Sequence, residues 1–329
     1  MSHPELKPDC LALDCEAEAT RIAARMIDIV GNDLRRRGAT IAISGGIDSA
    51  ACAALAARAF GPERVFGIML PERENSPESL ARGLAVAERF KLPHAVEDIT
   101  AALEGLGCYR RRDEAIRAVF PEFGDGWKSK IVIAGGQDGS FNYFRVVVRS
   151  PDGKQHEARL PAREYMQIVA ATNFKQRTRK ALEYFHADRL GYAVIGTPNR
   201  LEYDQGFFVK LGDGAADVKP IAHLYKTQVV ALARHLGVPE EICAAKPTTD
   251  TYSLAQGQDE FYFALPYQKM DIALWAFNHG VPAEAYAEQA GISAKQAQFI
   301  YRDIVAKRRT TRYLHAGPRL VEEVGGIEH

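Results

Sequence analysis

The sequence predicts an α/β fold: an open parallel sheet of the Rossmann type with helices on both faces. The first reason is the order of segments. Short apolar strands alternate with helix-like stretches along most of the chain, and this order is typical of a parallel sheet covered on both sides. The second reason is composition. With 47% hydrophobic and 26% charged residues, the 329-residue chain is ordinary for a globular protein that buries a large core.

The predicted elements follow one another in the order that this fold requires. An amphipathic helix over 16–37 precedes the first strand, "TIAIS" (40–44), and an alanine-rich helix begins after Ser49. Further strands are expected at "RVFGIMLP" (64–71), "HAVEDIT" (94–100) and "YAVIGT" (192–197). Further helices are expected at 77–93, about 162–188 and 224–237, the last closed by Gly237 and Pro239.

Two regions depart from the alternation. Residues 121–160 have the pattern of β-hairpins, with turns at "GGQDG" and "PDGK". We interpret them as an insertion in the α/β domain. The tail from 259 onward is mostly helix-like and lacks strand signals. We therefore expect residues 1–258 to form the α/β domain with its insertion, and 259–329 to form a helical C-terminal cap that extends the same domain.

Composition also limits the classes of function. The 42 basic and 42 acidic residues balance, so no global field draws the chain to nucleic acid or to an anionic membrane. No apolar stretch approaches the roughly 18 residues that span a bilayer, and acidic residues interrupt the N-terminus where a secretory signal needs an apolar run. Five cysteines without a C-x-x-C pair favour reduced thiols in a cytoplasmic protein.

The clearest motif is the turn between the first strand and its helix, Ser44-Gly45-Gly46-Ile47-Asp48-Ser49. Ligands of open parallel sheets bind beyond the carboxyl ends of the strands. There, glycines let backbone N–H groups surround an anion at the positive end of a helix. Asp48 would repel a phosphate unless a divalent cation bridges the two. The turn therefore predicts a magnesium pyrophosphate site, with a simple N-capped strand–helix turn as the alternative.

A second copy of nearly the same letters serves as a contrast. "AGGQDGS" (134–140) is followed by "FNYFRVVV", which reads as a strand. Without a helix behind it this segment lacks a helix dipole, so we expect a hairpin turn there.

"SGGIDS" resembles the pyrophosphate loop of the N-type ATP pyrophosphatases, which cleave ATP between its α and β phosphates. The stretch "GTPNRLEYDQGFFVKLGDGAADVKPIAHLYKTQVVALARHLGVPEEI" (196–242) is similar to the ammonia-dependent NAD synthetase family. That family shows G-T-x-x-x-x-E, then G-[FY]-F-x-K-x-G-D-G-x-x-D, then L-x-K-x-Q, and "KPTTD" (246–250) is similar to its next segment. The resemblance implies an adenine-nucleotide α-hydrolase-like fold and a homodimer.

The activity that the resemblance implies is ATP-dependent amidation of deamido-NAD to NAD with ammonia. An acyl-adenylate would form with release of pyrophosphate, and ammonia would then displace AMP. Such a site must hold pyrophosphate, supply Mg²⁺ and bring in ammonium.

The resemblance also implies a role for each matching residue. The residues expected to bind ATP are Ser44, Gly45, Gly46, Asp48, Ser49, Thr197, Lys226 and Thr248. Asp48 and Glu202 would ligate Mg²⁺, and Asp213 would accept ammonium, so Asp48, Lys226 and Asp213 form the expected catalytic set. The residues expected to hold the dinucleotide are Arg177, Lys210, Asp217 and Lys307. Lys307 is preceded by Ala306 where the family carries a histidine.

Several alternatives stay open at this stage. The acid could be nicotinate mononucleotide or another carboxylate, because the 121–160 insertion lies near where the substrate should enter. A tRNA-modifying ATP pyrophosphatase would need a persulfide-forming cysteine and a basic RNA surface, and a non-catalytic nucleotide-binding module would have no use for Lys210, Asp213 and Asp217. Glutamine-dependent members carry an amidase domain before the loop, and only residues 1–43 precede Ser44. We therefore expect free ammonia or a separate amidase partner.

Overall fold

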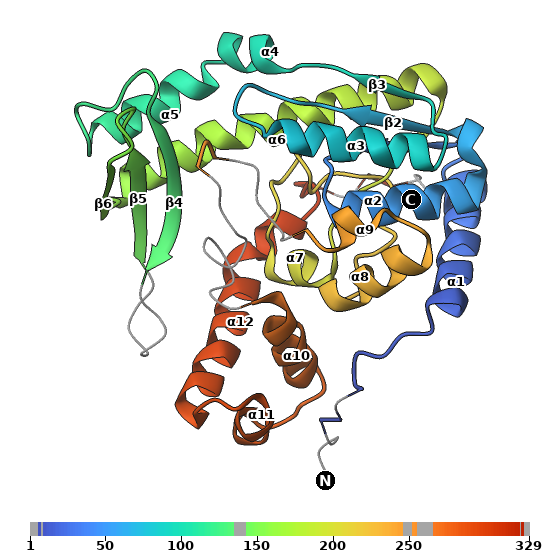
Figure 1. Ribbon diagram of the computed structural model, residues 1–329. Helices are drawn as coiled ribbons and strands as arrows, with labels where there is room; N and C mark the ends of the chain where they lie inside the picture. Colours follow the sequence, from blue (N-terminus) through green and yellow to red (C-terminus); the bar gives the residue numbers. More distant parts are fainter. Residues whose placement is uncertain are drawn as a thin grey trace.

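A four-stranded parallel sheet forms the centre of the protein, in the strand order β3-β2-β1-β7 (Figure 1). The computed structural model describes residues 6–7, 9–134, 143–245, 252–254, 266–322 and 324–325. The strands are β1 (Ala39–Ala42), β2 (Val65–Met69), β3 (His94–Val96) and β7 (Ala193–Val194). The predicted α/β class with a parallel sheet is confirmed, and each strand is shorter than its sequence segment.

Helices cover both faces of this sheet. On β2, Val65 and Met69 join one core cluster, whereas Phe66 and Ile68 contact a second cluster on the opposite face. This alternation shows that both faces of the strand are buried. The first cluster includes α1 (Cys15–Asp28), α2 (Ile47–Phe60), α3 (Pro77–Arg89), α8 (Lys226–His235) and α9 (Glu240–Cys243). The second includes α4 (Thr100–Gly105), α5 (Cys108–Arg117) and α6 (Ala162–Leu190).

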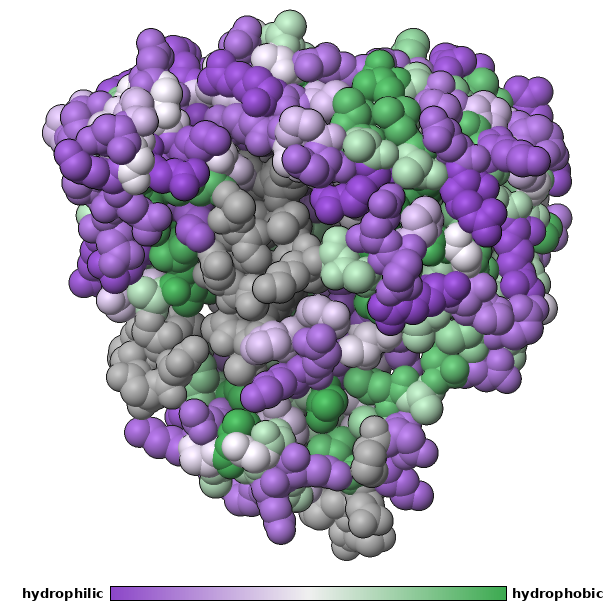
Figure 2. Space-filling model, in the orientation of Figure 1, coloured by the Kyte–Doolittle hydropathy of each residue, from purple (hydrophilic) through white to green (hydrophobic). Residues whose placement is uncertain are grey.

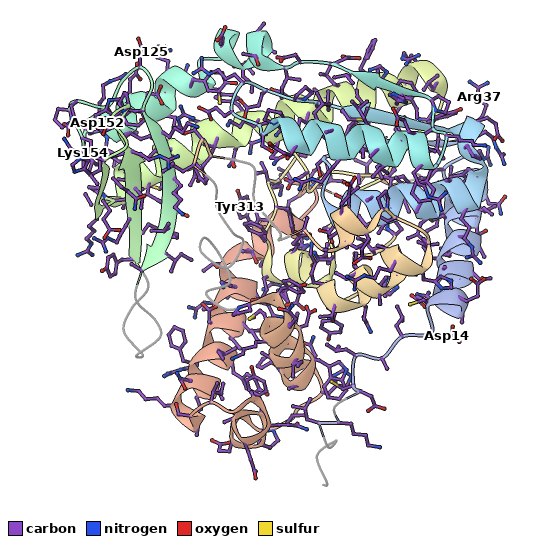
Figure 3. All side chains as sticks on the ribbon, viewed as in Figure 1. Asp14, Arg37, Asp125, Asp152, Lys154 and Tyr313 are labelled. Carbon is purple, nitrogen blue, oxygen red and sulfur yellow. The ribbon has the colours of Figure 1, made fainter. Side chains whose placement is uncertain are left out.

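The first helix is shorter than its apolar pattern predicts. Asp14, just before α1 in Figure 3, caps it by accepting a hydrogen bond from the backbone N–H of Ala17 at 3.0 Å. The α-helix ends at Asp28 and continues as a π-helical turn over Ile29–Asp33. Glycine and asparagine in that turn are weak helix formers, which accounts for the early end. Helices α4 and α5, and a 3₁₀ turn at Pro62–Arg64, were not expected.

The insertion forms an antiparallel sheet in the order β4-β5-β6. Its strands are β4 (Lys128–Ala134), β5 (Tyr143–Arg149) and β6 (Gln155–Arg159). The expected turn at "PDGK" joins β5 to β6, with Gly153 at φ +86°, whereas "GGQDG" lies outside the described residues. The sheet packs on α5 and on the N-terminal half of α6 through Ile131, Val146 and Ile168 (Figure 1).

The described part of the tail is helical, as predicted, with α10 (Tyr267–Asn278), α11 (Ala283–Ala290) and α12 (Ala294–His315). These helices share a core with Leu201 of α7 (Arg200–Gln205) and with Tyr225. The cap therefore packs against α7 and against the residue that precedes α8. None of the described helices is long and apolar enough to cross a membrane.

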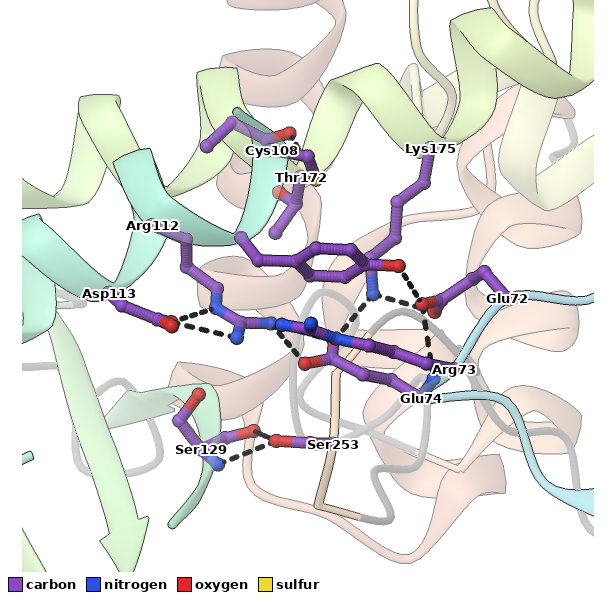
Figure 4. Close-up of polar contacts among 12 residues, drawn as sticks. Glu72, Arg73, Glu74, Cys108, Arg112, Asp113, Ser129, Thr172, Lys175 and Ser253 are labelled. Atoms are coloured by element: carbon purple, nitrogen blue, oxygen red, sulfur yellow. Dashed lines mark hydrogen bonds and ion pairs between the residues drawn. The ribbon is translucent and has the colours of Figure 1, made fainter. Parts of the chain in front are cut away.

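A buried network of charges ties the turn after β2 to α5 and α6 (Figure 4). Lys175 of α6 contacts Glu72 at 2.8 Å and Glu74 at 2.7 Å, and its side chain is only 1% exposed. Arg112 of α5 contacts Glu74 at 2.6 Å, and the Tyr109 hydroxyl donates to Glu72 at 2.7 Å. Burial alone would raise the pKa of Glu74, but Lys175 and Arg112 outweigh it and lower the pKa. Every charge in the network therefore has a partner, as buried charges require.

Candidate active site

A cavity of about 730 Å³ opens at the carboxyl ends of β1 and β7. Its walls include the loops that follow both strands, a face of α6, the start of α8 and the end of α12. From β1 the chain moves outward to β2 and β3 and then returns to β7 on the other side of β1. The cavity therefore lies at the switch point of the sheet, where open α/β folds bind ligands. Figure 2 shows hydrophilic residues over the upper left of one face of the protein and a hydrophobic patch at the upper right.

The loop after β1 is held in a curled shape by its own hydroxyls. The backbone N–H of Ser44 donates to Ser49 Oγ at 3.2 Å, and Ser49 Oγ donates to the carbonyl of Gly46 at 2.9 Å. Gly45 has φ +80°, and a Cβ there would lie 2.2 Å from the carbonyl oxygen of Ser79 at the start of α3. The loop thus needs glycine at 45 both for its backbone angle and for the close approach of α3. It places the N-terminus of α2 at the cavity.

Three helices begin around one buried ion pair. Asp48 lies in the first turn of α2, Glu202 in the first turn of α7, and Lys226 is the first residue of α8. Lys226 is 3% exposed and pairs with Asp48. Burial by itself would lower the pKa of Lys226, but the carboxylates of Asp48 and Glu202 outweigh it and raise the pKa. The side chain is therefore a cation fixed at the cavity floor.

Asn199 connects the two carboxylates, and the sequence analysis missed it. Its side-chain amide donates to Asp48 Oδ1 at 3.2 Å, and its backbone N–H donates to Glu202 Oε2 at 3.1 Å. Asn199 is the N-cap of α7 and forms a capping box with Glu202. The pattern "NRLE" was the available signal, because asparagine followed three residues later by glutamate is typical of such a box.

Three of the expected substrate residues lie on the cavity wall. Arg177, Lys210 and Lys307 all line it. Arg177 donates to the carbonyl of Lys210 at 3.3 Å, and Lys210 reaches the carbonyl of Tyr313 at 2.8 Å. Figure 3 shows Tyr313 centrally placed, below α6. Burial lowers the pKa of Lys307, although Asp303 at 2.7 Å partly compensates. The contact of Lys210 with Tyr313 attaches the end of α12 to the cavity wall.

Asp213 also lines the cavity, beside a charged pair that the sequence did not reveal. Its carboxylate accepts the backbone N–H of Val209 at 2.7 Å, and burial raises its pKa. Lys180 and Glu183, both on the cavity side of α6, form an ion pair at 2.7 Å with almost no exposed side-chain surface. Burial likewise raises the pKa of Glu183. The only sequence signal for this pair was their three-residue spacing on a predicted helix.

Arg179 is a further cavity residue that the sequence did not single out. It donates to the carbonyl of Leu70 at 3.1 Å and to the side chain of Asn75 at 2.9 Å. Both acceptors belong to the turn that the buried charge network fixes. That network therefore positions a guanidinium on the cavity wall.

Of the expected residues that the structure describes, Asp217 is not brought to the site. Asp217 does not line the cavity; it accepts the backbone N–H of Val194 at 2.7 Å and the Tyr184 hydroxyl at 3.2 Å. This carboxylate therefore holds the end of β7 to α6, and its substrate role stays a prediction. Thr248 and the rest of "KPTTD" lie outside the described residues. Thr197, Ser44, Gly46 and Ser49 line the cavity as expected.

The carboxylates Asp48 and Glu202 have the chemistry that Mg²⁺ requires. Across the described ranges, no group of three or more His, Cys, Asp or Glu side chains forms a ready metal site. Asp48 and Glu202, however, both contact Asn199 and both act on Lys226. Mg²⁺ is usually held by one or two carboxylates together with substrate phosphates and water. Two hard oxygen donors next to a phosphate-type loop fit that requirement.

Comparison with known proteins identifies the family. The sequence profile of the NAD synthase family matches residues 22–116 and 149–313. The NH(3)-dependent NAD(+) synthetase of Rhizobium rhizogenes is 54% identical over 323 residues, which cover 98% of this chain and 97% of that protein. The chain belongs to the NAD synthase family. Residues 117–148, which include β4 and most of β5, lie outside the family profile.

Solved structures share the fold of this NAD synthase family member. An NMN synthetase from Francisella tularensis superposes with a TM-score of 0.63 at 22% identity, covering 94% of this chain and 98% of that one. An NH3-dependent NAD synthetase from Campylobacter jejuni gives 0.62 at 19% identity, covering 94% and 100%. At these identities the likeness establishes the architecture, and the function has to be argued from the site.

The Gly45 geometry generates a first prediction. Gly45→Ala forces a β-carbon against Ser79 and a side chain into a left-handed backbone angle, so the free energy of unfolding should fall by at least about 1 kcal/mol. ATP affinity should fall with it, because the loop must open. Urea denaturation and ATP titration of the purified variant measure both effects.

Gly46→Ala is the matched control. A β-carbon at 46 meets nothing closer than Ser44 Oγ at 3.4 Å, and the backbone there has a negative φ. This variant should keep wild-type stability. Equal stability of the two variants would contradict the role given to the close approach of α3.

Proposed function

We propose that the protein is an ammonia-dependent NAD synthetase, which amidates deamido-NAD with ATP and ammonia and releases AMP and pyrophosphate. The observation that carries this proposal is the loop after β1 with Asp48, Glu202 and Lys226 gathered beside it. The name of the R. rhizogenes relative, which matches nearly the whole chain, supports it.

In the first step the loop holds the β and γ phosphates of ATP at the N-terminus of α2. Backbone N–H groups and the positive end of the helix favour that charge. A carboxylate oxygen of the substrate attacks the α phosphorus, and the bond to the pyrophosphate oxygen breaks. Lys226 stabilises the negative charge that builds on the leaving pyrophosphate. Because this ammonium is already buried and oriented, it needs little reorganisation during the reaction.

Asp48 and Glu202 would hold Mg²⁺ as it arrives with the nucleotide. When bound, the ion neutralises phosphate charge and polarises the phosphoryl oxygens. The contacts of Asn199 with both carboxylates keep them oriented toward one point.

In the second step ammonia attacks the acyl carbon, the bond from that carbon to the AMP oxygen breaks, and AMP leaves. Ammonium must lose a proton before it can attack. Asp213 would hold ammonium at the cavity wall. Burial raises the pKa of this carboxyl, so its carboxylate is a stronger base than that of an ordinary aspartate and would accept the proton.

The dinucleotide would lie along the cationic wall formed by Arg177, Lys210 and Lys307. These side chains complement the pyrophosphate of a dinucleotide. Asp217 and Thr248 stay predictions from the family resemblance. We also propose cytoplasmic location, to which the five free cysteines are suited, and free ammonia or a separate amidase as the nitrogen source.

A substrate panel tests the proposed activity. Purified protein with ATP, Mg²⁺ and ammonium should release AMP and pyrophosphate with deamido-NAD, and much less with nicotinate mononucleotide or aspartate. Product identification by chromatography distinguishes AMP from ADP. Formation of ADP, or turnover of a different acid in preference to deamido-NAD, would overturn the proposal.

The carboxylates provide a second test. Asp48→Asn and Glu202→Gln each remove a charge from the proposed metal, so kcat at limiting Mg²⁺ should fall about 100-fold. Glu63→Gln is the control, because that side chain is 75% exposed and lies past the C-terminal end of α2, whereas the loop lies at its N-terminal end. A near wild-type rate in either site variant would show that the metal assignment is wrong.

We further propose a homodimer, as the family resemblance implies. The large exposed apolar side chains include Met166 and Phe185 on α6, which are 63% and 56% exposed and would be covered in a dimer. Sedimentation equilibrium should give twice the chain mass. A stable, fully active monomer is the result that would refute this.

A further inference from the structure

The insertion contributes part of the wall of the active-site cavity. Ile133 of β4 and Phe144 of β5 line it, together with Tyr165 and Val169 of α6 and Tyr252. All five side chains are apolar or aromatic, in contrast to the charged wall near the phosphate loop. Ile133 and Phe144 both fall within residues 117–148, which the family profile does not match. This end of the cavity is therefore built partly by a segment that the family profile does not match.

Strand register explains how the insertion reaches the cavity. Ile131 pairs with Val146, and Ile133 pairs with Phe144, on the same face of the β4–β5 ladder. The first pair is fully buried in the core between the sheet and the helices. The second pair lies two residues further along each strand and is only partly buried. The same face thus serves as core for one pair and as cavity wall for the next.

Two aromatic rings at this wall are held in a fixed arrangement. Phe144 stacks on Tyr165 with ring centroids 4.0 Å apart and an interplanar angle of 15°. The backbone carbonyl of Phe144 accepts the N–H of Leu160 at 2.9 Å, which anchors β5 just before α6 begins. A pre-formed pair of flat rings offers a stacking surface that loses little side-chain entropy when a ligand binds.

The position of this wall along α6 indicates what it receives. Arg37, just before β1, contacts the carbonyl of Leu190 at 2.8 Å, so the C-terminal end of α6 lies at the amino end of the sheet. The N-terminal half of α6 extends past the carboxyl ends of the strands to the insertion (Figure 1). Tyr165 lies twelve residues before Arg177, or about 18 Å along the helix axis. Along α6, the aromatic wall is thus well separated from Arg177, which would face phosphates.

Polarity changes in the same direction along the cavity face of α6. Arg177, Lys180 and Glu183 lie toward the phosphate loop, and Tyr165 and Val169 lie toward the insertion. A dinucleotide whose carboxylated ring is at the α phosphate of ATP extends through its two phosphates to a second base. Of the two bases of such a substrate, the far one is both flat and remote from the reacting carboxylate, and it lies beyond the phosphates that Arg177 would face.

The geometry points to a specificity subsite at this wall: Phe144, Ile133 and Tyr165 stack against the second heteroaromatic base of the dinucleotide substrate. This inference rests on the proposed function and adds to it the reason for preferring a dinucleotide. A mononucleotide has no base at that position and gains nothing from the wall. The adenine of ATP is the alternative ring that would stack on the same wall.

The test compares Phe144→Ala and Phe144→Leu with the wild-type enzyme, using separate titrations of deamido-NAD, ATP and nicotinate mononucleotide. Base–aromatic stacking is strong enough that the KM for deamido-NAD should rise on the order of tenfold or more. kcat and the KM for ATP should change less than about twofold, and any mononucleotide turnover should be unaffected. Phe144→Tyr should restore the wild-type KM, because it restores the ring.

Tyr143→Ala is the matched control. Tyr143 is adjacent on β5, points to the opposite face of the strand and is 39% exposed. It should leave all three KM values unchanged. Phe144→Leu keeps apolar volume in the wall, so it supplies the comparison if Phe144→Ala does not fold by circular dichroism.

Failure of this inference and failure of the proposed function give different results. If wild-type enzyme does not turn over deamido-NAD, the proposed function fails before any variant is compared. If wild-type enzyme is active but Phe144→Ala and Phe144→Leu both keep its KM for deamido-NAD, the subsite is wrong. A rise confined to the KM for ATP would assign the wall to the adenine of ATP and would also overturn the inference.

Discussion

The buried ion pair between Lys226 and Asp48 is the interaction on which the site depends. A lysine that is 3% exposed must have a partner, and that requirement fixes the start of α8 against the start of α2. Glu202 and Asn199 extend the same constraint to α7. Three helix N-termini are thereby held around one point at the end of β1. The cation is desolvated before any ligand arrives, so its attraction to phosphate is not weakened by water.

The second support is the network around Lys175. It contributes no group to the cavity wall, yet it connects the turn after β2 with α5 and α6, and Arg179 is fixed on that turn. The insertion packs on the same two helices through a separate apolar core. The catalytic end and the insertion end of α6 thus have separate supports. A family member can add strands at one end without moving the charged groups at the other.

The sequence predicted the strand, turn and helix around Gly45 well because the information is local: strand, two glycines and helix lie within 21 residues. The sheet was predictable for the same reason, since each strand is a short apolar run. The end of β7 was not, because Ile195 still donates to the carbonyl of Thr40 in β1 while it also pairs with Val218, and the residues after it turn to line the cavity. Asn199 and the Lys180–Glu183 pair each have a local sequence signal, but only tertiary packing brings Asn199 to Asp48 and the pair to the cavity wall. Asp217 shows the converse case: a carboxylate within a strong motif that the fold uses to hold β7.

Net charge conceals the strongest electrostatic feature of the molecule. The whole chain is neutral, which argued against nucleic acid or membrane partners. Yet the described residues that line the cavity include seven arginines and lysines against four carboxylates, an excess of three positive charges. The carboxylates are not scattered through this wall, because two lie beside Lys226 and the other two beside Lys180. The excess of positive charge attracts anions, and low-dielectric walls concentrate the attraction. A protein that is neutral as a whole can therefore concentrate positive charge in one cavity, as the binding of two polyanionic nucleotides would require.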